Sequence, residues 1–298
     1  MTRKFDHLGD VETFINVVER GSLTAAAVHL STTASVISRA LARLEARLGC
    51  QLLRRTTRSI GLTDAGRSYL EQTRAALGQI EDAERSLQSD PDQVSGRVAL
   101  TAPTTFGHYR LPALLHGFAR QYPNVRIDLN ITNRNVDLAA EGFDFAIRQG
   151  VLKDSSMVAR KLMDAPLTLA CAPAYLQRRG TPESLDELEE HDCLSFLLPS
   201  TGRPVAWQFM RDGHAHDWTP ESATQVTDDV LGVVSLAEAG LGLCQSFDFI
   251  LRDKIARGAL VELLPQHAGR TRPFSLIYTE RRRLSAAARA LLEVLTGA

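Results

Sequence analysis

The chain has 298 residues, which is too long for one ordinary hydrophobic core, so we expect two folded units. Hydrophobic residues make up 44% and charged residues 23%, as in a globular protein. No stretch approaches the roughly 18 to 20 apolar residues of a membrane helix, and the N-terminus contains no apolar segment of a secretory signal. With four scattered cysteines, these features predict a cytoplasmic protein without a disulfide framework.

Charge is distributed unevenly along the chain. The net charge of −1 is uninformative, but the segment from Ser38 to Arg58 contains six arginines and a single acid, Glu45. A confined basic stripe in a near-neutral protein is typical of a surface that binds phosphate groups. Charge runs are more often plain solvated surface, so the stripe needs support from its structural context.

Three short helices are expected at the N-terminus. Apolar residues at helical spacing predict a first helix that ends near Gly21. Ser22 is a suitable N-cap for a short second helix, and a third helix is expected from about Thr33 to Leu48, with Gly49 as its stop. Its buried face should contain Ile37, Leu41, Leu44 and Leu48. Two helices joined by so short a turn are typical of a helix-turn-helix.

The outward face of the third helix has side chains that suit DNA. Serine, threonine and arginine can contact base edges and phosphates, and small residues allow close approach to the major groove. The candidate DNA-binding residues on this helix are Thr33, Ser35, Ser38, Arg39 and Arg43. On spacing alone, an ordinary three-helix core with a solvated face fits equally well.

The next segment favours DNA binding. Residues 51 to 63 are expected to form a short strand, a basic turn and a return strand, which is how a β-wing presents donors to the DNA backbone. A wing directly after a helix-turn-helix is a far more specific signal than either alone. The candidate DNA contacts in the wing are Arg54, Arg55, Thr56, Thr57 and Arg58.

At this point the chain resembles the LysR-type transcriptional regulators. The matching residues are Phe14, Gly21-Ser22, Ala25-Ala26-Ala27, Leu30, Ser35, Ser38-Arg39, Leu44-Glu45, Leu48-Gly49, Leu52-Leu53, Arg55-Thr56-Thr57-Arg58 and Leu62-Thr63-Asp64-Ala65-Gly66. Ala34 and Ala40 depart from the pattern, because the family often has glutamine at these positions. The resemblance implies a winged helix-turn-helix whose operator recognition differs in detail.

A long helix is expected from Ala65 to about Leu87. Leu70, Leu77, Ile80 and Leu87 keep two interleaved seven-residue spacings, which predicts a dimerisation seam. The alternative is a helix packed on its own domain, but the exposed charges and the polar linker at 89–95 favour a dimerisation helix. The resemblance implies the same.

From Gly96 the pattern changes to short strands that alternate with helical stretches, as in an α/β sheet. Strands are expected at 97–102, 125–131, 143–147, 167–172, 193–197, 241–244 and 274–278. Two sheets crossed twice by the chain would form paired subdomains with a cleft. This part resembles the periplasmic-binding-protein-like sensor of the same family. We therefore expect a DNA-binding domain at 1–63, a linker helix at 64–88, a hinge at 89–95 and an effector-binding domain at 96–298.

Ligands of open α/β sheets bind beyond the carboxyl ends of the strands. Such ends carry Thr104-Thr105, Thr132-Asn133-Arg134 and Arg148, and the opposite wall is expected to contain Gln245, Ser246 and Phe247, which follow the strand predicted at 241–244. Thr105 stands just before a predicted helix, where it could bind an anionic oxygen or act as a plain N-cap. Arg148 fits either ligand binding or a structural ion pair.

Two other patterns in the sequence do not predict a binding site. His191, Cys193, His214 and His216 do not have the spacing of a closed zinc site, so no metal is expected. Gly240-Leu-Gly242 is only a fragment of a dinucleotide-binding motif and fits a helix-to-strand turn better. The sequence therefore predicts no cofactor.

The function that fits these features is a sequence-specific transcriptional regulator whose promoter binding responds to a small metabolite. The expected partners are double-stranded promoter DNA, a small organic effector with an anion as the leading candidate, RNA polymerase, and further copies of the chain as a homodimer or dimer of dimers. No membrane partner is expected. The alternatives are a solute-binding receptor and a cytosolic α/β enzyme, although no catalytic set with usable spacing stands out, so no enzyme activity is expected.

Overall fold

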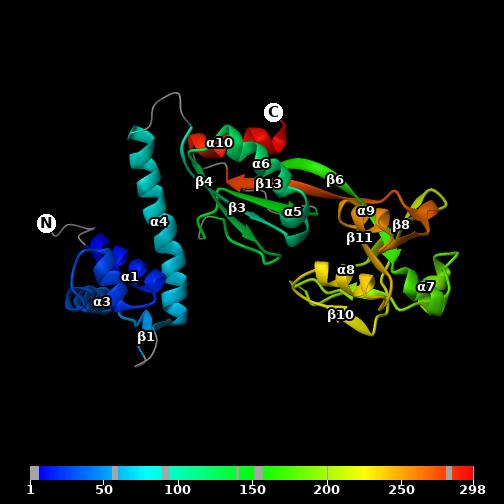
Figure 1. The fold of residues 1–298 in the computed structure, drawn as a ribbon, viewed down its shortest axis with the longest axis horizontal. Helices are drawn as coiled ribbons and strands as arrows, with labels where there is room; N and C mark the ends of the chain where they lie inside the picture. The colour runs from blue at the N-terminus through cyan, green and yellow to red at the C-terminus, as the bar shows by residue number, and fades with distance from the viewer. Residues whose placement is uncertain are drawn as a thin grey trace. The chain divides into compact units, whose positions relative to one another are not determined.

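The computed structural model describes residues 7–55, 60–88, 94–138, 141–150, 157–199, 201–279 and 284–297. These residues form two compact units, one built from the described residues up to Gln88 and the other from most of those after it (Figure 1). Within the described parts of the chain, no helix combines the length and apolarity needed to cross a membrane.

The first unit begins with the three predicted helices. They are α1 (Leu8–Arg20), α2 (Leu23–His29) and α3 (Ala34–Leu48). The Ser22 hydroxyl caps α2 by accepting from the Ala25 amide at 3.0 Å, and α1 and α3 end at left-handed glycines. Phe14 and Leu41 are fully buried between the helices. Leu48 was expected on this buried face but is 37% exposed, because the last turn of α3 extends past the core.

A two-stranded wing follows the helices. Strands β1 (Leu53–Arg55) and β2 (Ile60–Leu62) are antiparallel, with Leu53 opposite Leu62. The chain then enters α4 (Asp64–Gln88), where Gly66 lies so close to the wing that a Cβ would be 2.0 Å from the Leu52 carbonyl oxygen. Only glycine allows this contact, which positions the wing against the start of α4.

The second unit has a mixed sheet in the order β11-β6-β13-β5-β3-β4, and β12 also pairs with β6. Strands β3 (Gly96–Ala102), β4 (Val125–Ile131) and β5 (Phe145–Gln149) are parallel to one another. Helices α5 (Thr104–Tyr109), α6 (Leu111–Gln121) and α10 (Ala286–Thr296) accompany this part, which we call lobe 1.

Two long strands connect lobe 1 to a second lobe. The first half of β6 (Met157–Cys171) pairs with β13 (Thr271–Thr279), and its second half pairs with β11 (Cys244–Phe247) and β12 (Val261–Leu263). Lobe 2 is built around β11, β12 and the end of β6, and Figure 1 shows β11 beside the strand β6 that enters this lobe. Its other elements are α7 (Pro173–Arg179), β7 (Leu194–Phe196), β8 (Trp207–Arg211), β9 (His214–Trp218), β10 (Thr224–Val226), α8 (Leu231–Glu238) and α9 (Asp248–Ala256), with 3-10 turns at Asp186–Glu190 and Pro265–His267.

The expected two-lobed α/β fold is thus confirmed, but some elements differ from prediction. The strand expected at 241–244 begins at Cys244 instead, because Gly242 is a close-contact turn whose Cβ would be 2.0 Å from the Asp192 carbonyl oxygen. Gln245, Ser246 and Phe247 therefore lie within β11 rather than after a strand. The β8–β9 hairpin was not predicted. Its strands carry charged and histidine residues that obscure the alternating pattern.

Candidate functional site

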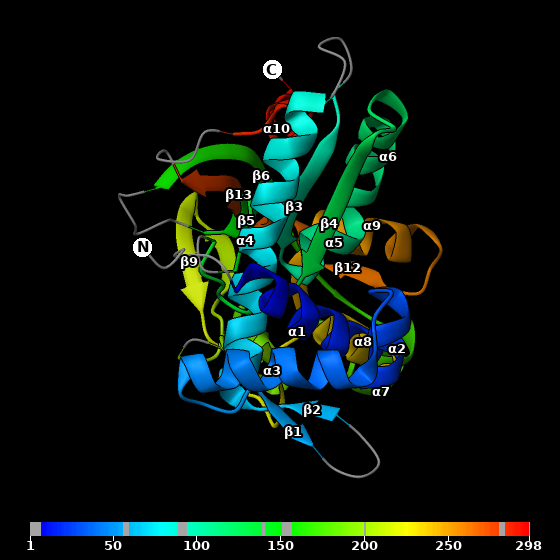
Figure 2. The same cartoon turned by 90° about the vertical axis from the view of Figure 1, so that its left-hand side faces the viewer.

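The outward face of α3 is open to solvent. Thr33, Ser35 and Arg39 are exposed, and Ser38 is partly buried. Figure 2 shows α3 and the β1–β2 wing at the same end of the first unit. Thr33 is the N-cap of α3, and its hydroxyl accepts from the Val36 amide at 3.4 Å. Because its own cap bond and its bond with the Ser35 hydroxyl hold it in place, Thr33 presents a fixed hydroxyl at the start of the helix. Ala40, unlike Ala34, is buried, so it has no surface for DNA.

Arg43 differs from the other candidates on α3 because it has a partner in α1. Its guanidinium binds the Asp10 carboxylate in a forked pair, with Nε to Oδ2 at 3.1 Å and Nη2 to Oδ1 at 2.5 Å. The hydrogen bond to Asp10 raises the pKa of Arg43 above its ordinary value. Arg43 therefore connects two helices of the first unit.

The wing is fixed by Glu45, the single acid in the basic stripe. Its carboxylate accepts from the amides of Leu52 and Leu53, at 2.8 and 3.2 Å. The carboxylate therefore fixes the backbone where the chain enters the wing. Arg54 is exposed on β1. The side chain of Arg55 and the predicted contacts Thr56, Thr57 and Arg58 lie outside the described residues.

The residues predicted for the dimerisation seam on α4 have different environments. Leu70 is 8% exposed and packs, with partly buried Leu77, against the core of the first unit. Ile80 is 44% exposed. The prediction that Leu70 faces a partner chain does not fit this burial, because residues from α1 and the wing already cover this apolar face of α4. The Leu87 side chain lies outside the described residues.

A cavity of about 1070 Å3 lies between the two lobes of the second unit. The carboxyl ends of β3, β4 and β5 open onto it from lobe 1, and β7, β8 and β11 line it from lobe 2. Of the predicted effector residues, the cavity brings together Thr105, Thr132, Arg148, Gln245, Ser246 and Phe247. Thr104 does not line it.

Thr105 lies in the first turn of α5, not before it as expected. It is 1% exposed, and its hydroxyl has no hydrogen-bond partner among the described residues. Thr105 is therefore not an N-cap, and its hydroxyl is available to a molecule in the cavity. Arg148 lies at the end of β5 and donates to the Ile147 carbonyl at 2.8 Å.

Thr104 connects the lobes instead. Its hydroxyl donates to the Asp229 carboxylate at 2.8 Å, and its amide donates to the Asn133 side chain at 3.1 Å. The Asn133 amide nitrogen in turn donates to the Asp228 carbonyl at 2.7 Å. These contacts bridge lobe 1 and lobe 2 beside the cavity.

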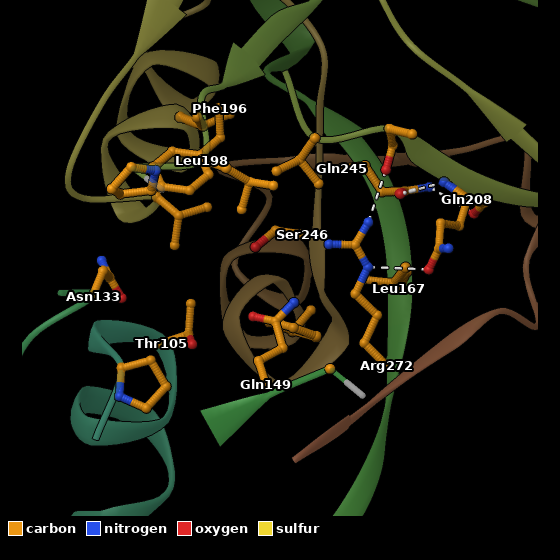
Figure 3. A pocket seen from close by; sticks show the side chains of 18 of the residues that line it. Thr105, Asn133, Gln149, Leu167, Phe196, Leu198, Gln208, Gln245, Ser246 and Arg272 are labelled. Carbon is orange, nitrogen blue, oxygen red and sulfur yellow. Dashed lines mark hydrogen bonds between the residues drawn. The ribbon is translucent and has the colours of Figure 1, made fainter. Parts of the chain in front are cut away.

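Gln245 lines the cavity, but its side-chain carboxamide already has partners. Its oxygen accepts from the backbone N–H of Gln208 at 2.8 Å, and its nitrogen donates to the backbone carbonyl of Gln208 at 2.9 Å, so the side chain joins β11 to β8. The Gln208 side chain accepts from Arg272 Nε at 3.0 Å, and Arg272 Nη2 donates to the Ala206 carbonyl at 2.8 Å (Figure 3). Gln245 therefore supports a wall of the cavity rather than offering free polar groups to a ligand.

Comparisons with known proteins agree with both halves of this architecture. Residues 8–67 match the family described as bacterial regulatory helix-turn-helix protein, lysR family, and residues 91–298 match the LysR substrate binding domain. The chain belongs to the LysR family of transcriptional regulators.

Relatives of this LysR-type regulator match it along nearly its whole length. The regulator CrgA of Neisseria meningitidis is 31% identical over 96% of this chain and 95% of its own length. The transcriptional activator AaeR of Escherichia coli is 31% identical over 98% of this chain and 93% of its own. The full-length structure of the Vibrio cholerae virulence activator AphB superposes with a TM-score of 0.64, at 26% identity, and covers 98% of this chain and 99% of that one.

Two residues of the regulator's cavity, Arg272 and Gln208, were not identified from the sequence, because they come from segments without a motif. Asn133 belongs to the strand end Thr132-Asn133-Arg134, and it lines the cavity as the strand-end rule predicts. Among the described residues, no three histidine, cysteine, aspartate or glutamate side chains lie close enough together to hold a metal ion, and this includes His191 and Cys193. Burial raises the pKa of Cys193 to about 12, so this thiol is neutral at physiological pH.

Proposed function

We propose that the regulator docks α3 in the major groove of promoter DNA, with the wing on the backbone, and that a small organic anion in the cavity modulates this binding. Exposed Thr33, Ser35 and Arg39 support base and phosphate contacts at α3, and Arg54 supports phosphate contact at the wing. We include Ser38, Arg55, Thr56, Thr57 and Arg58 in the proposed DNA surface. Arg43 would contribute through its positioning pair with Asp10.

The observation that supports the anionic effector best is the charge of the cavity. Among the described lining residues are four arginines and one aspartate, Asp228. An excess of positive charge in a concave, largely apolar site favours a negatively charged ligand. Thr105, whose hydroxyl has no partner within the described part of the chain, is a proposed ligand contact, together with Thr132, Arg148, Ser246 and Phe247.

We further propose the following organisation. The DNA-binding domain covers 1–63, the linker helix 64–88, the hinge 89–95 and the effector-binding domain 96–298. The regulator acts in the cytoplasm without enzymatic activity, as a homodimer or dimer of dimers, and RNA polymerase is a further partner. The exposed Ile80 on α4 favours contact with a second copy. Such assembly would couple the paired DNA-binding heads to the lobes of the sensor.

The proposal is tested by fluorescence anisotropy on a labelled fragment from upstream of the regulator's own gene, at several salt concentrations. If Arg54 contacts a phosphate, Arg54→Ala weakens binding to all sequences and lowers the salt slope by about 0.9 per site. Arg39→Ala reduces discrimination between operator variants if Arg39 contacts a base. Equal affinity of the wild type for this fragment and for unrelated DNA would contradict the proposal.

A further inference from the structure

Arg272, at the start of β13, is held in a fixed orientation on the cavity wall. Two of its three guanidinium nitrogens are engaged, Nε by the Gln208 side-chain oxygen and Nη2 by the Ala206 carbonyl. Figure 3 shows the remaining end of the guanidinium directed into the cavity, toward Ser246 and Gln149. An arginine whose fork is fixed by two acceptors loses little conformational freedom when the third nitrogen binds a ligand.

The acceptors that hold Arg272 are neutral. Within the described residues, no carboxylate forms an ion pair with its guanidinium. Burial lowers the pKa of Arg272 from its ordinary value, Asp217 opposes this shift from a distance and Arg270 adds to it. A partly buried cation with only neutral partners is incompletely compensated, and an anion in the cavity would supply the missing charge.

The other arginines of the cavity are engaged elsewhere. Arg270, two residues before Arg272, forms an ion pair with the Asp217 carboxylate at 3.1 Å, although its Nη1 makes no hydrogen bond of good geometry among the described residues. Arg148 donates to the Ile147 carbonyl, and both it and Arg134 have further interactions within the chain. This distribution favours a ligand with one anionic group, placed at Arg272, over a ligand with several.

Several apolar side chains lie opposite and beside Arg272. Phe196 and Leu198 lie across the cavity, as Figure 3 shows, and Leu167 lies beside the arginine. Trp207 also lines the space and is 4% exposed. Burial of an apolar group against these side chains would contribute favourable free energy that an inorganic anion cannot gain. At about 1070 Å3, the cavity is large enough for such a body in addition to the charged group.

We propose that the effector is an organic acid with a single anionic group and an apolar body, and that Arg272 is its anchor. The acid group binds the inward-facing nitrogen of Arg272 with the Ser246 hydroxyl nearby, and the body lies against Phe196, Leu198 and Trp207. The buried Thr105 hydroxyl, which has no partner among the described residues, meets a polar substituent of the ligand on the lobe 1 side. This inference rests on the proposed role of the cavity as the effector site.

The test is calorimetric titration of the full chain with a panel of acids and their neutral amides. Phenylacetate with phenylacetamide provides an aromatic body, octanoate with octanamide an aliphatic one, and inorganic phosphate provides an anion without a body. We expect at least one acid to bind, its amide to bind about tenfold or more weakly, and phosphate not to compete. Quenching or shift of tryptophan emission should accompany binding, since Trp207 lines the cavity.

Three variants assign the charge preference to one residue. Arg272→Gln should weaken binding of the acid about tenfold or more and abolish the preference for acid over amide. Arg272→Lys, which keeps the charge and loses the fork, should retain part of that preference. Arg270→Gln removes the same charge from the same wall, but this charge is already paired with Asp217, so the loss should be smaller. Circular dichroism checks that each variant is folded.

The inference is overturned if no acid of the panel binds, if amides bind as well as acids, or if folded Arg272→Gln keeps the full preference. Phosphate binding as tightly as the acids would also overturn it, because the apolar body would then contribute nothing. DNA binding is measured separately on the same samples. A chain that recognises its promoter fragment but fails these titrations loses this inference alone, whereas loss of promoter recognition refutes the proposed function and leaves the titrations interpretable.

Discussion

The Thr104 hydroxyl and the Asp229 carboxylate form a 2.8 Å hydrogen bond between residues 125 positions apart in sequence. Thr104 belongs to lobe 1 and Asp229 to lobe 2, so this bond joins the two lobes beside the cavity. The neighbouring bond from Asn133 to the Asp228 carbonyl reinforces it. Asp228 has a φ of +62°, a conformation that is uncommon for residues other than glycine and aligns its carbonyl with Asn133.

Removal of the Thr104 hydroxyl should loosen the lobes. Thr104→Val keeps the shape of the side chain and deletes the bonds of its hydroxyl to Asp229 and to the Asn133 side chain, which we expect to cost about 1 to 3 kcal/mol of the free energy that holds the two lobes together. Hydrogen–deuterium exchange should then become faster in α5 and around Asp228. Thr181→Val, a matched change at an exposed threonine, is the control. Unchanged exchange in Thr104→Val would show that the bond does not hold the lobes.

The contact between Glu45 and the wing predicts a separable effect on the first unit. Glu45→Ala leaves the Leu52 and Leu53 amides without their acceptor, and we expect a loss of about 1 to 3 kcal/mol in the free energy of unfolding of this unit. Glu45→Gln keeps an acceptor oxygen and should lose less. Urea denaturation followed by circular dichroism measures both. Equal loss in the two variants would contradict a role for the acceptor oxygen.

Local patterns allowed the helix-turn-helix to be predicted from the sequence. Ser22, Thr33 and Gly49 are caps whose chemistry acts within a few residues, so the helix boundaries follow from neighbours along the chain. The strand ends at Thr105, Thr132 and Arg148 were also predictable, because parallel strands bring their carboxyl ends to one edge.

The other wall of the cavity could not be predicted in the same way. Arg272 is oriented by Ala206 and Gln208, which lie 66 and 64 positions earlier. The periodicity of apolar residues reports only local structure, so it cannot predict such a distant contact. Leu70 shows the converse problem. Its seven-residue spacing with Leu77 fits an intersubunit seam and an intradomain core equally, and only tertiary packing decides between them.

Asp128 in β4 predicts how acid affects the second unit. Burial would raise the pKa of its carboxyl, but hydrogen bonds and charge from Arg97 and Arg126 prevail and lower it below the ordinary value of 3.8. A lowered folded-state pKa stabilises the fold above the unfolded-state value and loses that contribution as the pH falls through the folded-state value. Asp128→Asn should therefore lower the free energy of unfolding near neutral pH. Below about pH 4, the free energy of unfolding of the variant should fall less steeply with pH than that of the wild type. Urea midpoints between neutral and acidic pH measure this, and parallel curves for both proteins would contradict it.

Two residues on α4 should separate folding from assembly. Leu70 is buried in the core of the first unit, so Leu70→Ala should lower the free energy of unfolding of this unit by about 2 to 5 kcal/mol.

Ile80 is 44% exposed, so Ile80→Glu should change the stability of an isolated chain by no more than about 0.5 kcal/mol. If Ile80 packs against a second copy, however, the new charge is buried unpaired and the dimer dissociates. Sedimentation velocity measures the assembly state and thermal denaturation the stability. Ala76→Glu, at an exposed position of the same helix, controls for the added charge. A fully dimeric Ile80→Glu would place the interface elsewhere on the chain.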